Sequence, residues 1–255
     1  MATYKKKGYK KEKRSKNDLE YLSQESTTAE VFSSLDEGAS KIEVFFEKNQ
    51  KAIFILLFAI VAGVAGYMWY DSNVKTPREQ EGVDNMVSAQ TYFDKALTEA
   101  DEKVANEDFD KAINGADGKY GFKQVADKYS GTKAGNLANY SLGMIYYKKG
   151  EFKNAVSYLS KFDGDDDVLQ ALAYGTVGDA FVELEQNKDA LDYYKKALAV
   201  SDNAFTAPKF YLKAGKLALD MGDKAKANKY FKIVKDKYAT SDEAKNIDQF
   251  IVLSK

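Results

Sequence analysis

The 255-residue sequence predicts an all-α protein in which one apolar helix precedes a row of helical hairpins. Three observations predict this class: residues 52–70 form an uncharged run of nineteen positions, a segment of about 35 residues recurs in the C-terminal half, and the chain has only two prolines. An uncharged run of about 20 residues is long enough to cross a bilayer as a helix. Repeats of this length are typical of helical solenoids.

Composition excludes several classes of function. The chain contains no cysteine and no histidine, which removes disulfides, thiol nucleophiles, zinc fingers, His-based metal sites and the Ser-His-Asp triad. Its 38 Lys and Arg residues balance 39 Asp and Glu residues, for a net charge of -1, so the chain as a whole does not attract nucleic acid. We therefore expect no enzyme activity, no cofactor, no metal and no specific nucleic-acid partner.

Residues 1–50 are predicted to be a basic, largely disordered segment, because the stretch from Lys5 to Lys16 holds eight Lys or Arg residues. This stretch would be a solvated tail, a contact for anionic lipid headgroups or a contact for ribosomal RNA, and the sequence leaves these alternatives open. Apolar residues between Val31 and Phe46 recur at helical spacing. They predict two short amphipathic helices, broken at Gly38, that would lie on the membrane surface.

The apolar run AIFILLFAIVAGVAGYMWY predicts a transmembrane helix over residues 51–71, with residues 52–70 in contact with lipid. Lys51 precedes the run, and Trp69 and Tyr70 close it, as expected for residues at a membrane interface. A buried core helix and a cleavable signal segment are the alternatives, although the run is longer and starts later than a signal segment does. Residues 1–51 hold eleven Lys or Arg residues, which predicts a cytoplasmic N-terminus and an extracytoplasmic domain over residues 78–255.

Three stretches of the C-terminal domain align with one another: ANYSLGMIYYKKGEFKNAVSYLSKF from Ala138, AYGTVGDAFVELEQNKDALDYYKKA from Ala173 and FYLKAGKLALDMGDKAKANKYFKIV from Phe210. Each has a glycine and, twelve residues later, an alanine, which we expect at the closest approach of two antiparallel helices. Larger residues, among them Leu159, Tyr194 and Phe231, would fill the remaining seam. The glycine and alanine of each stretch are Gly143 and Ala155, Gly178 and Ala190, and Gly215 and Ala227. In the turns, Gly150, Asn187 and Gly222 are predicted to end the first helix of each hairpin.

This pattern resembles the tetratricopeptide repeat, over roughly residues 119–250. The resemblance implies repeats at about 136–169, 171–206 and 208–240. A degenerate first repeat at about 79–134 would have helices from Glu79 to Val104 and from Phe122 to Tyr129, with NEDFDKAINGADG as an irregular insertion. Residues 241–255 would form a capping helix that starts at Ser241.

In that family, the first helices of stacked hairpins line a concave groove that binds extended peptides or a helix of a partner. The alternative is that the corresponding residues are ordinary surface or seam positions. The positions carried over are Tyr140, Met144, Tyr147, Asp179, Val182, Glu183, Lys209, Lys216 and Leu219.

The run from Asp163 to Asp167, DGDDD, has a partial likeness to a calcium loop. Its glycine is misplaced and the closing glutamate is missing, so the run predicts an acidic turn between repeats.

The order of basic segment, single span and repeat domain resembles the YfgM-type ancillary translocon proteins, in particular a version found in Bacteroidota. The resemblance implies a bacterial inner-membrane protein with a periplasmic domain. It would assist secreted or envelope proteins as they emerge from the Sec translocon, with translocon subunits, periplasmic chaperones and emerging polypeptides as partners. The alternative is a structural scaffold of an envelope complex, such as a secretion, cell-wall or outer-membrane assembly apparatus, that binds no unfolded clients.

Overall fold

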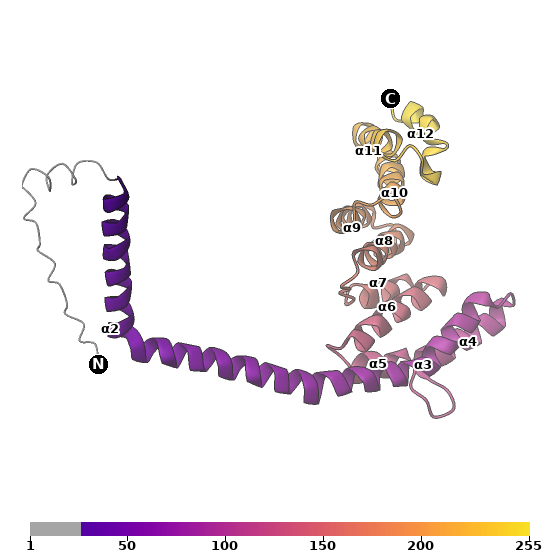
Figure 1. Cartoon of the computed structure of the whole chain (residues 1–255). Helices are drawn as coiled ribbons and strands as arrows, with labels where there is room; N and C mark the ends of the chain where they lie inside the picture. The colour runs from indigo at the N-terminus through magenta and orange to yellow at the C-terminus, as the bar shows by residue number, and fades with distance from the viewer. Residues whose placement is uncertain (1–26) are drawn as a thin grey trace, which may run out of the picture. The chain divides into compact units, whose positions relative to one another are not determined.

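The structure, a computed structural model, describes the backbone of residues 27–255 and side chains from residue 43 onward. The expected disorder of the basic stretch before residue 27 lies outside the described residues. All elements of the described part are helices, which confirms the predicted fold class (Figure 1). The described part of the chain divides into two units, with the boundary between Met68 and Trp69, and these are considered separately.

Helix α2 runs from Thr27 to Tyr70, and all of it except its last two residues belongs to the first unit. The expected break at Gly38 is wrong, because α2 continues through this residue. A glycine inside a helix costs only about 1 kcal/mol relative to alanine, and the good helix formers Glu37 and Ala39 flank it. One glycine is therefore not enough to end a helix of this length.

No residue in the apolar part of α2 is buried. The helical segment Glu43–Thr98 includes an 18-residue window with a mean hydropathy of 2.3, none of which is buried. The described residues thus contain one helix that is long and apolar enough to cross a membrane. A core helix of a soluble protein would bury such a face, so the exposure favours the predicted span.

In the second unit, α2 is followed by a π-helical turn, Asp71–Lys75, and then by α3 (Thr76–Thr98) and α4 (Glu102–Asn114). The expected single helix from Glu79 to Val104 and the irregular NEDFDKAINGADG insertion are both wrong. The chain turns after Thr98, and Asp101 starts α4 by accepting hydrogen bonds from the backbone N–H groups of Lys103 and Val104. Apolar residues on one face of α4, including Phe109 and Ile113, then pack it against α3.

A buried carboxylate joins α3 and α4. The side chain of Asp108 is 1% exposed, and its oxygens lie 2.9 Å from Lys111 Nζ and 3.1 Å from Lys95 Nζ. The hydrogen bond from Lys111 lowers the pKa of Asp108, with Lys95 acting in the same direction and burial opposing both. Asp108 therefore stabilises the fold most when it is ionised.

We expect Asp108→Asn to destabilise the protein at neutral pH and to make its stability less sensitive to acid. The folded pKa of Asp108 lies below its unfolded value of about 3.9, so its contribution is complete above that value and is lost as the pH falls through the folded pKa. Thermal unfolding between neutral pH and pH 3 measures this. Asp84→Asn, an exposed change on α3, is the control, and equal acid sensitivity of Asp108→Asn and the parent protein would contradict the prediction.

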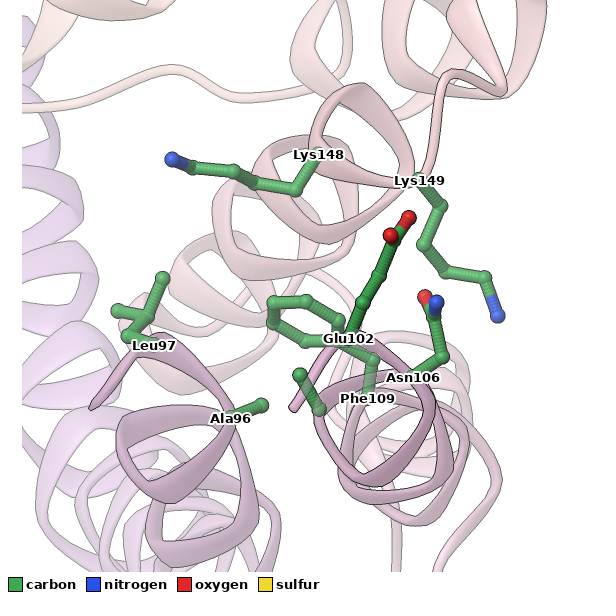
Figure 2. A pocket seen from close by; sticks show the side chains of 8 residues that line it. Ala96, Leu97, Glu102, Asn106, Phe109, Lys148 and Lys149 are labelled. Carbon is green, nitrogen blue, oxygen red and sulfur yellow. The ribbon is translucent and has the colours of Figure 1, made fainter. Parts of the chain in front are cut away.

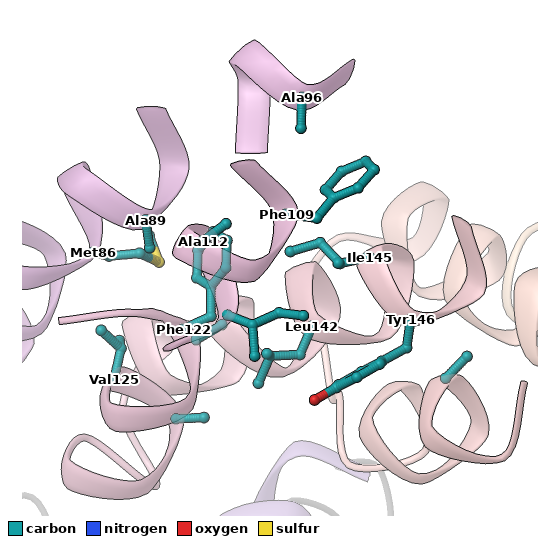
Figure 3. Packing of buried hydrophobic residues seen from close by; sticks show 14 of the residues in the cluster. Met86, Ala89, Ala96, Phe109, Ala112, Phe122, Val125, Leu142, Ile145 and Tyr146 are labelled. Carbon is teal, nitrogen blue, oxygen red and sulfur yellow. The ribbon is translucent and has the colours of Figure 1, made fainter. Parts of the chain in front are cut away.

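Helix α5 (Phe122–Lys128) forms where a helix was expected, but it packs chiefly on α6 (Lys133–Lys148). Its residues lie in the core that joins the first hairpin to the repeats (Figure 3). There, Phe122 and Val125 of α5 meet side chains of three other helices, namely Met86 and Ala89 of α3, Phe109 and Ala112 of α4, and Leu142 and Ile145 of α6.

Three helical hairpins follow. They are α6 with α7 (Phe152–Leu159), α8 (Asp167–Glu183) with α9 (Asn187–Val200), and α10 (Ala207–Asp220) with α11 (Lys224–Lys237). Within each pair the two helices pack on one another, and each pair also packs on the next (Figure 1). The hairpins therefore form a continuous row.

In each of the three hairpins, a glycine of the first helix makes room for a large side chain of the second helix. A Cβ atom on Gly143 would lie 2.9 Å from Leu159 Cδ2, and one on Gly215 would lie 2.8 Å from Phe231 Cδ1. At Gly178 the nearest atom is Tyr194 Cε1, at 2.6 Å. The paired alanines are fully buried, but the seam residues, and not the alanines, are the nearest neighbours of the glycines.

Each first helix ends in a Schellman motif. Gly150 and Gly222 have φ angles of 73° and 81°, as expected, but in the second repeat the left-handed residue is Glu185, with φ 59°. The prediction of Asn187 for this role is wrong, because Asn187 is already the first residue of α9. Glu185 N–H bonds to Val182 O and the next N–H to Phe181 O, in the same pattern as at Gly150.

We expect Glu185→Gly to stabilise the second repeat by about 1 kcal/mol, because a side chain in the left-handed region costs roughly that much. Chemical unfolding followed by circular dichroism measures the change. Glu183→Gly, two residues earlier inside α8, is the matched control and should destabilise the protein. A lower stability of Glu185→Gly than of the parent would contradict the prediction.

The row ends with a short 3-10 turn, Asp242–Ala244, and helix α12 (Ile247–Leu253). The capping helix is therefore shorter than expected. The predicted role of Ser241 as a side-chain cap is wrong, since its hydroxyl is buried without a hydrogen-bond partner. One 3-10 turn does not present the first-turn N–H groups of an α-helix that such a cap requires.

Candidate functional site

The start of α3 is fixed to the turn between α5 and α6 by two adjacent residues. The carboxylate of Glu79 accepts hydrogen bonds from the backbone N–H groups of Lys133 and Ala134, both at 2.7 Å, at the first turn of α6. Arg78 Nη2 donates to Lys128 O, 2.8 Å away, at the end of α5. The negative charge of Glu79 thus lies at the N-terminal end of α6, and the positive charge of Arg78 lies at the C-terminal end of α5. The helix dipoles favour both placements.

A close approach of the backbones supports this contact. A Cβ atom on Gly82 would lie 2.8 Å from Ala134 Cβ and 3.1 Å from Tyr129 Cγ, so only glycine fits here. Asn85 Nδ2 also donates to the hydroxyl of Tyr129, at 2.9 Å. Helix α3 is therefore an integral part of the repeat domain.

A hollow of about 830 Å³ opens beside this contact. It is lined by the end of the π-helical turn, the first turn of α3, the first turns of α6 and the loop between α7 and α8, including Lys75, Lys133, Leu137, Phe162 and Asp165. The lining includes positively charged, negatively charged and apolar side chains, which is typical of surfaces that bind polypeptides.

The acidic run DGDDD forms the wall of the hollow contributed by the α7–α8 loop. Asn136 holds it, donating to Asp163 O at 2.5 Å and accepting from Asp163 N–H at 2.9 Å. Asp166 caps α8 through Leu169 N–H, and Asp165 lies 2.9 Å from Lys133 Nζ. In the part of the chain that the structure describes, no group of three or more acidic side chains is arranged to hold a metal ion.

In the first repeat, the residues predicted for the groove lie on α6 and are half-buried. The ring of Tyr140 lies 5.1 Å from that of Phe162, and the ring of Tyr147 lies 5.7 Å from that of Phe152. Met144 packs into the same cluster as Tyr140. These three side chains therefore combine a packing role with partial access to solvent.

In the second repeat, Asp179 connects three helices. It accepts a hydrogen bond of 2.8 Å from the hydroxyl of Tyr194 on α9, and Lys213 Nζ on α10 lies 2.7 and 2.6 Å from its two oxygens. Burial, and then the charge of Asp179, raise the pKa of Tyr194. Asp179 is therefore engaged within the array, whereas Glu183, one turn later, is exposed.

The structure brings part of the predicted set together across two repeats. Burial raises the pKa of Tyr147, and the nearby charges of Asp179 and Glu183 raise it further. These residues of α6 and α8 therefore form the centre of the candidate face. Val182 is half-buried at the same end of α8.

In the third repeat, the predicted residues lie on α10 and are farther from this centre along the chain. Lys216 is exposed with its ammonium 4.8 Å from the ring of Phe250, and Lys209 lies 5.7 Å from the ring of Phe205. Leu219 is half-buried against the last core cluster.

Leu137, Tyr194 and Lys213 contribute to this region but were missing from the predicted set. Leu137 occupies the repeat position that Lys209 occupies in the third repeat, so the repeat spacing contains the signal that would find it. No comparable signal marks Lys213, whose role depends on the packing of α10 on its neighbours.

Comparison with known proteins agrees with this geometry. One tetratricopeptide-repeat family model matches residues 138–162 and 171–203, and a second matches residues 210–241. No curated protein matches the chain. Tetratricopeptide repeats generally act as interaction modules without enzymatic activity. The region from residue 138 to residue 241 therefore consists of tetratricopeptide repeats, and the protein is a helical-repeat protein with the architecture of a protein-protein interaction module.

Proposed function

We propose that this protein is anchored in a membrane by residues 52–70 and binds other polypeptides on the face formed by α6, α8 and α10. The hollow beside Leu137 carries this proposal. It borders Lys75, which ends the π-helical turn that directly follows Tyr70. A binding surface that begins this close along the chain to an apolar span is suited to polypeptides that leave the same membrane.

The chemistry of the face suits segments without a strict sequence. Tyr140, Met144 and Tyr147 offer polarisable and aromatic surface, and Met is common where a protein binds varied apolar partners. Glu183 and Lys216 add exposed charges of both signs. The positions where related repeats clamp a terminal carboxylate hold no Lys and Asn set, which favours internal segments over chain ends.

The protein assists secreted or envelope proteins as they emerge from the Sec translocon, together with periplasmic chaperones. The likeness of its layout to the YfgM-type proteins supports this role. In this arrangement the N-terminus is cytoplasmic and the repeats are in the periplasm, as the positive residues before the span favour.

A photocrosslinking amino acid tests the binding face in the full-length protein in native membranes. We expect crosslinks to many polypeptides from Leu137 and Tyr147, and few from Lys188, an exposed residue of α9 that serves as the control. Equal labelling at all three positions would refute the proposed face.

Purification from solubilised membranes tests the cellular role. Translocon and chaperone subunits among the crosslinked partners would support assistance to emerging proteins. A fixed set of cell-wall or secretion components, without varied clients, would refute it in favour of a structural scaffold.

A further inference from the structure

The two ends of the repeat domain carry opposite charge and exposed apolar side chains. Residues 76–114, which form α3 and α4, contain ten acidic and four basic residues, whereas residues 224–255 contain eight lysines and four acidic residues. We propose that copies of this chain associate head to tail, with the C-terminal end of one repeat domain on the tip of the α3–α4 hairpin of the next.

The C-terminal end presents a patch formed by α12 and the first half of α11, here called the terminal patch. Val252 and Leu253 are 63% and 59% exposed, and they line an apolar hollow of about 480 Å³. Asn228 holds the end of α12 on α11 by donating to Ser254 Oγ at 2.9 Å. Lys224 Nζ lies 3.4 Å from Lys255 O, so lysines adjoin the apolar pair.

Helix α11 supplies a surplus of positive charge beside this patch. It contains six lysines and one acidic residue. Three of these lysines form ion pairs: Lys226 with Asp223, Lys235 with Asp248, and Lys237 with Asp202. Among the described residues, Lys229 and Lys232 have no ion-pair partner, and they lie on one face of the helix because they are three positions apart.

The tip of the α3–α4 hairpin is the complementary surface. Leu97 and Val104 are 48% and 37% exposed on either side of the turn that contains Glu99, Asp101 and Glu102. A hollow of about 200 Å³ lies here, and Figure 2 shows Leu97, Phe109 and Glu102 along it.

Two lysines at the end of α6, Lys148 and the following Lys149, also border this hollow, so its charge is not purely negative. Lys149 is already paired with Asp110, at 2.5 Å, and Lys148 is exposed. The three carboxylates of the turn outnumber Lys103, which follows Glu102, and Lys148, so the tip keeps a net negative charge.

A second copy fits the terminal patch better than a contact within one chain or a symmetric contact. The two surfaces lie at opposite ends of the row of hairpins (Figure 1), so one chain does not join them. A two-fold contact would bring the lysines of two terminal patches together, which like-charge repulsion disfavours. Apolar contacts surrounded by opposite charges match the usual anatomy of a protein interface.

Disulfide crosslinking tests the arrangement in the full-length protein, because the chain has no cysteine of its own. One copy carries Leu97→Cys and the other Leu253→Cys, both at exposed positions where the change leaves the core intact. After oxidation of the mixture in detergent, we expect dimers that join position 97 to position 253. Dimers that form equally well from either variant alone would overturn the proposal.

Charge exchange tests the cause of the association. Lys224→Glu with Lys229→Glu in the Leu253→Cys copy should reduce the crosslink at least about fivefold at low salt. Glu99→Lys with Glu102→Lys in the Leu97→Cys copy should do the same, and mixing the two altered copies should restore it. Lys188→Glu with Lys196→Glu, on α9, is the matched control. A crosslink that the exchanges leave unchanged, or that their combination does not restore, would overturn the proposal.

Discussion

Replacing Gly135 with alanine is expected to destabilise the first repeat by about 3 kcal/mol. The added Cβ atom would lie 2.7 Å from the carbonyl carbon of Tyr129 and closer still to its oxygen. These are backbone atoms, which have no rotamer by which to move aside, and Gly135 N–H also bonds to the Thr132 hydroxyl that caps α6. Thermal unfolding of the full-length protein in detergent, followed by circular dichroism, measures the loss.

Gly66→Ala provides the matched control, since Gly66 is also helical and has no atom within 4 Å of an added Cβ. This change should be neutral or slightly stabilising, because alanine is the better helix former. If the two variants unfold alike, the close contact between α6 and the Tyr129 carbonyl is not present in solution.

Phe231→Ala is expected to destabilise the last repeat by about 3–5 kcal/mol. The ring is fully buried, fills the space left by Gly215 and lies 5.3 Å from the ring of Phe250 on α12. Because repeat arrays are stabilised mainly by contacts between neighbours, hydrogen exchange should increase in α10, α11 and α12. Protection in α3 and α4 should stay close to that of the parent, and a uniform loss along the domain would contradict this.

A double substitution tests whether Gly215 and Phe231 form one packing unit. Gly215→Ala alone should destabilise the repeat because its Cβ would meet the ring of Phe231. Phe231→Leu should recover part of that loss, since residues in contact show coupled effects on the free energy of unfolding. Strictly additive losses would show that the two positions do not interact.

The repeats could be predicted because their packing requires particular residues at a fixed period. Gly143, Gly178 and Gly215 mark places where a Cβ atom would meet a large side chain of the paired helix, and this constraint is visible in one sequence. Helix α4 was missed because Asn106, Asp108 and Asp110 resemble a loop by composition. Two lysines compensate for the burial of Asp108, which composition does not show.

The candidate face was predictable only by position. Repeat spacing placed all nine residues on α6, α8 and α10, but the exposure of each depends on its neighbours. The link of Asp179 to Lys213 and Tyr194 brings together residues from three helices, as does the contact of Arg78 and Glu79 with the α5–α6 turn. No local pattern encodes such contacts, because they depend on how the helices pack.

The contact of Arg78 and Glu79 has a mechanical consequence. No flexible segment separates Lys75 from the first repeat, because hydrogen bonds join the first turn of α3 to α5 and α6. Tension applied to the chain at Asp71 would therefore load the α5–α6 turn directly, and a twist of α3 about its own axis would turn the first repeat with it. Within this unit, the start of α3 and the first repeat therefore respond to such a load as one body.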